Sequence, residues 1–403
     1  MRSFERVYEL TQQTPMIHFQ YGEHGATLRA TEVKPKLDKY IFERYKADNR
    51  GDDVPESWKL GESNALNYKM HITSSNKEVL NVGPKTAYDI FYGNMGSNDN
   101  KKAVFSKDIE LKIICTIKEM LVYINEVIKP FFISCNFGTM QRKGFGSFTI
   151  GEPSDEEVAK ELLRNYDAKC CYAFPANETA IKRPSEKDVT FKRIKTVYGI
   201  MKSGINIEIN KGIKKYRRSL LFLYMHEKYG ISNEKAFLKQ NGMAPVNVGT
   251  HKNEEKEYLY SIRKHKPKYV RALLGVSGKL EFIKDTNYRG DKAIVRIKNN
   301  DIQRLKSPVF FKIVGNTVYY VGEKINDEVY NKKFSFESDY NNRTTEIAVP
   351  DKKDFDLDGF LRYCQKELNK KERYLEYGFT ALTNFWDCRN IWIRRFEGGQ
   401  WHE

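Results

Sequence analysis

A chain of 403 residues is long enough for two or three domains, since a domain has roughly 100–200 residues. It carries 69 Lys and Arg against 53 Asp and Glu, a formal net charge of +16, and 13% of its residues are aromatic. The aromatic content excludes a disordered chain, and the apolar runs are far shorter than the about 20 residues of a membrane helix. The first residues contain no apolar stretch typical of a signal peptide, so we expect a cytoplasmic protein with no membrane partner.

The six cysteines predict neither a metal site nor a disulfide framework. No two of them form a CxxC pair, and no histidine lies beside them at zinc-finger spacing. In a cytoplasmic chain of this length such cysteines are typical of isolated reduced thiols. We therefore expect no metal and no cofactor.

In the first half, the predicted elements form a β-α-β-β-α-β order. Extended segments at 5–10 and 15–20 precede a helix over 35–46, in which Pro35 suits the first turn. Short strands at 67–74 and 78–82 and a longer one at 103–116 follow, then an amphipathic helix over 116–129 that Pro130 ends, and a strand at 147–150. This order predicts a ferredoxin-like domain, also called RNA-recognition-motif-like (RRM-like).

The second half begins with a polar helix and a loop over 154–182, and continues with a basic, mostly helical stretch over 183–260 that includes a C-cap at Gly230. Strands are predicted at 268–276, 279–283, 293–298 and 307–325, the last with a hairpin turn after Gly315, followed by a helix over 357–374 and a strand at 391–396. The fold class is α+β, with two ferredoxin-like halves. The predicted division is 1–153, a basic middle segment or insertion over 154–262, and 263–403.

The positive charge is clustered. Between residues 182 and 228 there are 13 basic and 4 acidic residues, with Phe191, Tyr198 and Tyr216 among them. Lysine and arginine neutralise phosphates while aromatic rings stack on unpaired bases, so the pattern favours nucleic-acid binding. A solvated lysine-rich surface is the alternative.

The sequence "GTMQRKGFGSF" at 138–148 is a second candidate. Gly138, Gly144 and Gly146 can adopt positive φ, and Arg142 and Lys143 add charge, so exposed amides could cradle a phosphate. The spacing matches neither GxxxxGK[ST] nor GxGxxG, which disfavours nucleotide hydrolysis. A plain glycine turn between helix and strand is the alternative.

Several segments together carry a resemblance to a known family. These are "LTQQTPMIHFQ" with "ATLRATEVKPKLDKYIF", then "FYGNMG", then "FFISCNFGTMQRKGFGSFTI", and more weakly "VRALLGV" and "IQRLKSPVFFKI". They resemble the RAMP superfamily of CRISPR systems, and within it the two-domain subunit of the type III-B (Cmr) effector that lies near the guide 3′ end. The resemblance covers residues 5–150 well and 266–330 weakly.

The resemblance implies a non-catalytic RNA-binding subunit of an antiviral ribonucleoprotein. Its partners would be guide RNA, target RNA and other CRISPR effector subunits. The residues implied or predicted to contact RNA are basic, glycine or amide residues of the segments above, namely Arg29, Lys34, Lys36, Lys39, Gly138, Gln141, Arg142, Lys143, Gly144, Gly146, Arg217, Arg218, Arg271, Arg304 and Lys306.

Two other functions remain open. Guide-processing RAMP nucleases cleave RNA without metal through a histidine, and His18 and His24 lie where such a residue could be. A structural or RNA-contacting role for both is the alternative. Asp38 is interpreted as a surface charge rather than as a catalytic aspartate. A basic scaffold that binds protein and not RNA is the third possibility.

Overall fold

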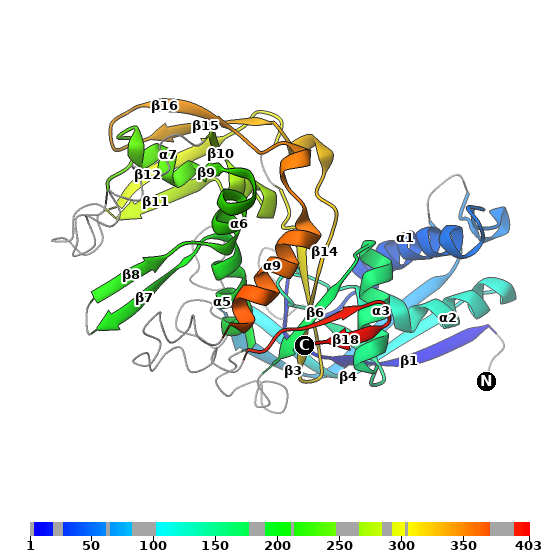
Figure 1. The fold of residues 1–403 in the computed structure, drawn as a ribbon. Coiled ribbons are helices and arrows are strands. Elements are labelled where there is room, and N and C mark those ends of the chain that lie inside the picture. The colour runs from blue at the N-terminus through cyan, green and yellow to red at the C-terminus, as the bar shows by residue number, and fades with distance from the viewer. Residues whose placement is uncertain are drawn as a thin grey trace.

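The computed structural model describes most of the chain. The described residues are 4–18, 27–61, 65–82, 102–176, 190–210, 213–246, 266–283, 292–302, 305–370 and 391–403. His24 and Arg304 lie outside them, and Arg217 is described only in its backbone. Two halves of mixed helix and sheet lie against one another, with the C-terminal strands near the contact between them (Figure 1).

The N-terminal half is a five-stranded antiparallel sheet with two helices. Its elements are β1 (Glu5–Gln12), β2 (Met16–Ile17), α1 (Ala30–Asp48), η1 (Glu56–Trp58), β3 (Lys69–Asn81), β4 (Lys102–Ile114), α2 (Lys118–Ser134) and β5 (Phe148–Ile150). The strands lie in the order β3-β4-β1-β5, and the short β2 pairs with the other end of β4. This order is compatible with the predicted ferredoxin-like arrangement.

Both helices extend past the boundaries that proline predicted. Pro35 lies inside α1 rather than in its first turn, and Pro130 lies inside α2 rather than at its end. Phe131, Phe132 and Ile133 are fully buried beyond Pro130, and burying each such side chain stabilises the protein by about 1.5–3 kcal/mol. That gain is comparable to the cost of an interior proline, about 3 kcal/mol, so tertiary packing continues the helix.

The two short strands predicted at 67–74 and 78–82 are one strand. β3 pairs with β4 along its whole length, with register shifts around Ser75. Asn76 has a φ of 50°, the left-handed conformation typical of a bulge. The polar run at the bulge interrupts the apolar alternation and hides the continuity of the strand.

The C-terminal half repeats the arrangement. Its main sheet has the order β13-β14-β6-β17-β18, and its strands and last helix are β6 (Cys171–Pro175), β13 (Val309–Val314), β14 (Thr317–Gly322), α9 (Leu357–Asn369), β17 (Arg394–Glu397) and β18 (Gln400–His402). The predicted hairpin at Gly315 and the final strand are confirmed. The predicted end of α9, at 374, lies outside the described residues. β6 comes from the predicted middle segment, so that segment supplies the central strand of this sheet.

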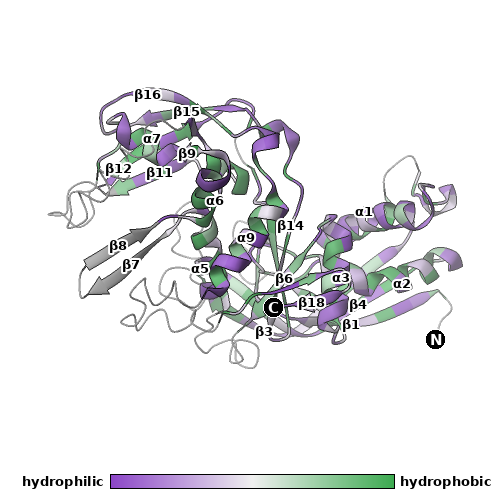
Figure 2. Cartoon of the chain, in the orientation of Figure 1, coloured by the Kyte–Doolittle hydropathy of each residue, from purple (hydrophilic) through white to green (hydrophobic). Residues whose placement is uncertain are grey.

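Helices cover both faces of this second sheet. α3 (Asp155–Tyr166) packs its Val158, Ala159 and Leu162 on one face. α5 (Thr190–Lys202) and α9 pack on the other, and α6 (Leu220–Tyr229) packs against these two helices. Figure 2 shows hydrophobic and hydrophilic residues on each of α1, α2 and α3, as expected of helices with one buried face.

The rest of the middle segment is less helical than predicted. β7 (Ile205–Asn210) and β8 (Ile213–Arg217) form an antiparallel hairpin that projects from the molecule (Figure 1). Gly230, with a φ of 60°, is the predicted C-cap of α6. The elements that follow are β9 (Ile231–Asn233), α7 (Glu234–Gln240) and β10 (Lys266–Lys268).

A separate four-stranded sheet lies beyond α7. It has the order β11 (Lys279–Ile283), β12 (Lys292–Lys298), β15 (Lys333–Ser338) and β16 (Thr344–Ala348). Short helices η3 (Asp327–Val329) and η4 (Lys352–Asp354) flank these strands, and η2 (Val270–Leu274) precedes them. The strand predicted at 268–276 is wrong, because this short apolar run forms η2, and a run of that length does not distinguish a strand from a helical turn.

Polar groups and a buried lysine join the two halves. Lys312 of β13 is fully buried, and its Nζ donates to the carbonyl oxygens of Phe132 (2.7 Å), Cys135 (2.8 Å) and Phe148 (3.2 Å). Two of these acceptors lie at the C-terminal end of α2, where the helix dipole favours a cation. Burial lowers the pKa of Lys312 to about 7. The edge strand of the second sheet is thereby fixed to the first half.

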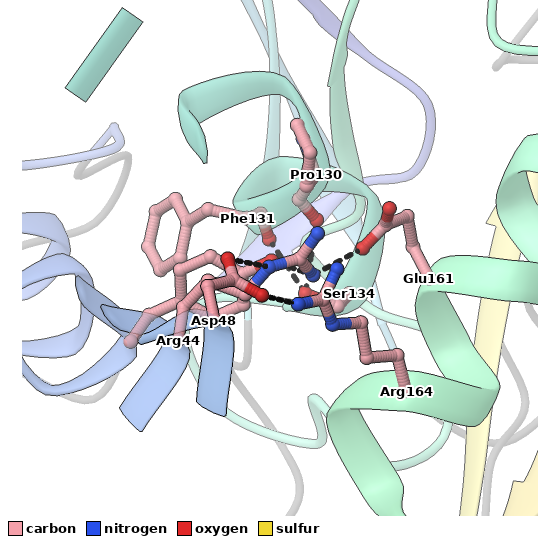
Figure 3. Close-up of polar contacts among 8 residues, drawn as sticks. Arg44, Asp48, Pro130, Phe131, Ser134, Glu161 and Arg164 are labelled. Atoms are coloured by element: carbon pink, nitrogen blue, oxygen red, sulfur yellow. Dashed lines mark hydrogen bonds and ion pairs between the residues drawn. The ribbon is translucent and has the colours of Figure 1, made fainter. Parts of the chain in front are cut away.

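A second contact joins α1 to α3 (Figure 3). Arg44 of α1 pairs through Nη1 with Glu161 of α3 at 2.8 Å and through Nε with Asp48 at 3.3 Å. Arg164 of α3 completes the network by pairing with Asp48. Several charges that form a network contribute more to stability than isolated surface pairs do, so this contact helps to fix how the halves sit.

In the described part of the chain, every helix is either too short or too polar to cross a membrane.

Candidate nucleic-acid interface

The glycine loop at 138–148 lies between the two halves, with its amides directed at protein. The predicted positive φ values are present, at 76° for Gly138, 89° for Gly144 and 65° for Gly146. Gly138 N–H donates to Glu32 Oε1 (2.6 Å), Gly144 N–H to the Gln141 carbonyl (3.3 Å) and Gly146 N–H to the Pro15 carbonyl (2.9 Å). The prediction of an exposed cradle of free amides is therefore wrong. Gly138 and Gly146 allow the chain to pass close to neighbouring backbone, and Gly144 leaves room for the Ile313 side chain.

The two cations of this loop have partners in the C-terminal half. Arg142 Nη1 pairs with Glu323 Oε2 at 2.6 Å, and Lys306 pairs with the same carboxylate at 2.7 Å. Lys143 Nζ lies 3.0 Å from the centre of the Tyr198 ring. Burial lowers the pKa of Lys143 well below its usual value, and the nearby charges of Lys202 and Arg142 lower it further.

The basic residues at the start of α1 mainly hold the helix in place. Lys34 Nζ donates to Asp38 Oδ2 (2.8 Å) and to the Leu66 carbonyl (2.9 Å). Asp38 is only 4% exposed, so its interpretation as a surface charge is wrong. Lys36 Nζ donates to Gln141 Oε1 (2.9 Å) and to the Asn136 carbonyl, which ties α1 to the glycine loop.

The other predicted RNA contacts of the N-terminal half differ in exposure. Arg29 is the half-buried N-cap residue of α1. Lys39 is exposed and lies 3.6 Å from Glu43. Only Lys39 therefore presents most of its side chain to solvent.

His18 is held by a carboxylate. Its Nε2 lies 3.5 Å from Glu32 Oε2, and the other oxygen of Glu32 accepts the Gly138 amide. One carboxylate thus fixes the predicted histidine, the glycine loop and the first turn of α1. This arrangement favours a structural role for His18.

In the second half, Arg271 is part of a buried ion pair. Its Nε lies 3.2 Å from Glu234 Oε1, and the side chains are 11% and 0% exposed. Burial raises the pKa of Glu234, and the Arg271 guanidinium opposes that rise. Arg218, just before α6, is exposed. Of these two predicted RNA contacts, only Arg218 is accessible in this arrangement.

The fold also brings together residues that the sequence did not single out as a site. Lys202 Nζ donates to the Gly275 carbonyl (2.7 Å) and lies 5.9 Å from the centre of the Tyr198 ring. The Tyr198 hydroxyl donates to the Leu274 carbonyl (2.5 Å) and lies 2.8 Å from Ser307 Oγ. Tyr198 and Lys202 are four residues apart on α5, so the helical period of the basic segment could have paired them.

The open face of the N-terminal sheet does not resemble a base-stacking platform. Its central rows run across β1, β4 and β3. One row consists of Val7, Lys112 and His71, and the other of Glu9, Glu110 and Thr73. The alternate residue Tyr8 points to the helices and donates to Asn125 Oδ1. Stacking on RNA bases needs aromatic rings, which are absent from these rows.

Among the described residues, no group of three or more His, Cys, Asp or Glu is arranged to hold a metal ion.

Comparison with known proteins gives matches along nearly the whole chain. The family model described as the Cmr1 N-terminal domain matches residues 4–205, and the model described as the Cmr1 C-terminal domain matches residues 216–383. A search of curated proteins finds no match. Among solved structures, the crystal structure of Cmr1 from Pyrococcus furiosus (apo form) is similar over 98% of this chain and 100% of that chain, with 11% sequence identity and a TM-score of 0.38.

Proposed function

Because the chain belongs to the Cmr1 family of type III-B CRISPR effector subunits, we propose that it is a non-catalytic subunit that holds RNA by its sugar–phosphate backbone. The RNA is the guide, alone or paired with its target. The subunit acts in the cytoplasm beside other effector subunits in antiviral defence. The division at 1–153, 154–262 and 263–403 remains a prediction.

The observation that carries this proposal is the excess of cations in one segment. Residues 182–228 hold 13 basic and 4 acidic residues, within a chain of net charge +16. On α5, Lys192 and Lys195 are exposed. Such a segment attracts phosphates without reading sequence, which suits a subunit that must accept any guide.

We expect the purified full-length chain to bind single-stranded RNA with an affinity that falls steeply with salt. The logarithm of the binding constant should fall linearly with the logarithm of salt concentration, with a slope of about −0.7 for each phosphate neutralised. Fluorescence anisotropy of a labelled repeat-derived RNA measures this slope. Absence of binding at low salt, or binding that salt does not weaken, would contradict the proposal.

The same RNA distinguishes the nuclease alternative. Incubated with the protein in EDTA, it should remain intact. A cleavage product that disappears in His18→Ala or in His24→Ala would replace the non-catalytic function with RNA processing.

A further inference from the structure

Lys143 lacks an acidic partner, although it is enclosed by both halves. Its ammonium lies on the face of the Tyr198 ring, at 3.0 Å from the ring centre. Within the described part of the chain, its side chain makes no hydrogen bond or ion pair. A cation–π contact contributes about 0.5–2 kcal/mol, which replaces only part of the hydration that an ammonium loses on burial.

Lys202 approaches the same ring from the C-terminal half. Its Nζ has one hydrogen-bond acceptor among the described residues, the Gly275 carbonyl, and therefore keeps donors to spare. A Cβ on Gly275 would lie 3.5 Å from this Nζ and 3.2 Å from the Leu305 carbonyl. The glycine, with a φ of 106°, therefore keeps the space beside the ammonium free of a side chain.

The nearby carboxylates are already engaged. Glu323 pairs with Arg142 and Lys306, and Glu234 pairs with Arg271. Burial lowers the pKa of Lys202 to about 7, and the Arg271 charge adds to that effect. In the described residues, the two lysine side chains beside this ring thus have no carboxylate left to stabilise their charged forms.

We propose that Lys143 and Lys202, whose ammonium groups both lie near the Tyr198 ring at the junction of the two halves, bind a phosphate group of the bound RNA. This inference rests on the proposed function. A phosphate supplies the missing negative charge and accepts hydrogen bonds from both ammonium groups. Because the ring face is covered by Lys143, the site takes a phosphate rather than a stacked base. The same chemistry would accept a free phosphate ion, which the test must separate.

The first test compares two double variants of the full-length chain. Lys143→Met/Lys202→Met removes the two junction cations. The control Lys46→Met/Lys333→Met removes two exposed cations, one on α1 and one on β15, that each lie 3.6 Å from an acid. The net charge changes equally in both. We expect RNA affinity to fall about tenfold in the junction variant, with a salt slope shallower by about 1, and less than twofold in the control.

The thermal unfolding temperature distinguishes an RNA-binding role of the two junction lysines from a structural role. Since each junction lysine is held at an energetic cost in the absence of RNA, the junction variant should unfold at the same or a higher temperature than the wild type. If the wild type binds RNA and the junction variant binds it as well as the control does, the inference fails and the proposed function stands. If the wild type itself does not bind RNA, the proposed function fails first.

Chemical protection in the wild-type protein needs no variant. Lysines with a lowered pKa acylate readily near neutral pH, and peptide mass spectrometry reports the modification at Lys143 and Lys202. We expect RNA to protect both lysines, and inorganic phosphate to protect them only at much higher concentration. Protection by phosphate but not by bound RNA would identify a free-phosphate site and overturn the RNA assignment. Lysines that neither RNA nor phosphate protects would also overturn it.

Discussion

Replacing Arg271 with methionine is expected to lower the free energy of unfolding by about 3–5 kcal/mol. The reason is the position of its partner, since Glu234 is fully buried and faces Arg271 at 3.2 Å. Without the guanidinium, a carboxylate must either stay charged in the interior or take up a proton. Chemical denaturation followed by circular dichroism measures the loss.

The effect should depend on pH in a defined direction. Burial raises the pKa of Glu234, and removing Arg271 leaves that rise unopposed. In the variant, the unfolded state loses the carboxyl proton at a lower pH than the folded state, so stability falls as pH rises above the unfolded pKa. The difference in the free energy of unfolding between wild type and Arg271→Met should therefore become smaller as the pH is lowered.

Two controls separate this role from RNA contact. The double variant Glu234→Gln/Arg271→Met should recover most of the lost stability, because no buried charge remains. Lys39→Met, which removes an exposed partner of Glu43, should cost at most about 0.5 kcal/mol. An Arg271→Met protein that is as stable as wild type but binds RNA weakly would mean that Arg271 is an RNA contact, as the sequence first predicted.

The second large effect concerns Gly146, for which alanine should cost on the order of 3 kcal/mol. A Cβ at this position would lie 1.9 Å from the Phe137 carbonyl oxygen, and the residue has a φ of 65°. Backbone must therefore move in the segment that contacts β13. Denaturant unfolding of Gly146→Ala tests this.

Gly151 is a matched control for the backbone conformation. It also has a φ of 65°, but a Cβ there would meet nothing within 4 Å. Gly151→Ala should therefore cost only about 1 kcal/mol, the penalty for the left-handed conformation alone. If Gly146→Ala and Gly151→Ala lose the same free energy of unfolding, the close packing of the loop is not the reason that Gly146 is required.

The sequence predicted the element types well where the periodicity was long and regular. The apolar spacing of α2 and the hairpin at Gly315 are both present. Its errors occur where packing outweighs a local signal, as when α2 continues past Pro130 because the phenylalanines beyond it are buried. Nothing local to residue 130 reports that burial.

The candidate site was harder to predict, because its contacts are long-range. The glycines of the loop were correctly expected to have positive φ, yet their amide partners, such as Glu32, lie far away in the sequence. The charge of Lys143 was visible, but its position on the Tyr198 ring depends on how the halves pack. Composition identifies cations, whereas only the fold shows which of them are already neutralised.

Photo-crosslinking of RNA to the full-length protein tests the central claim most directly. An RNA carrying photoreactive uridines should crosslink to peptides from the junction, chiefly residues 138–147 and 190–204, when it is bound at moderate salt. Two results would contradict the claim that this subunit holds RNA where its two halves meet. One is crosslinks confined to the open face of β1, β3 and β4. The other is the absence of any crosslink to this subunit when the rest of a reconstituted effector binds the RNA.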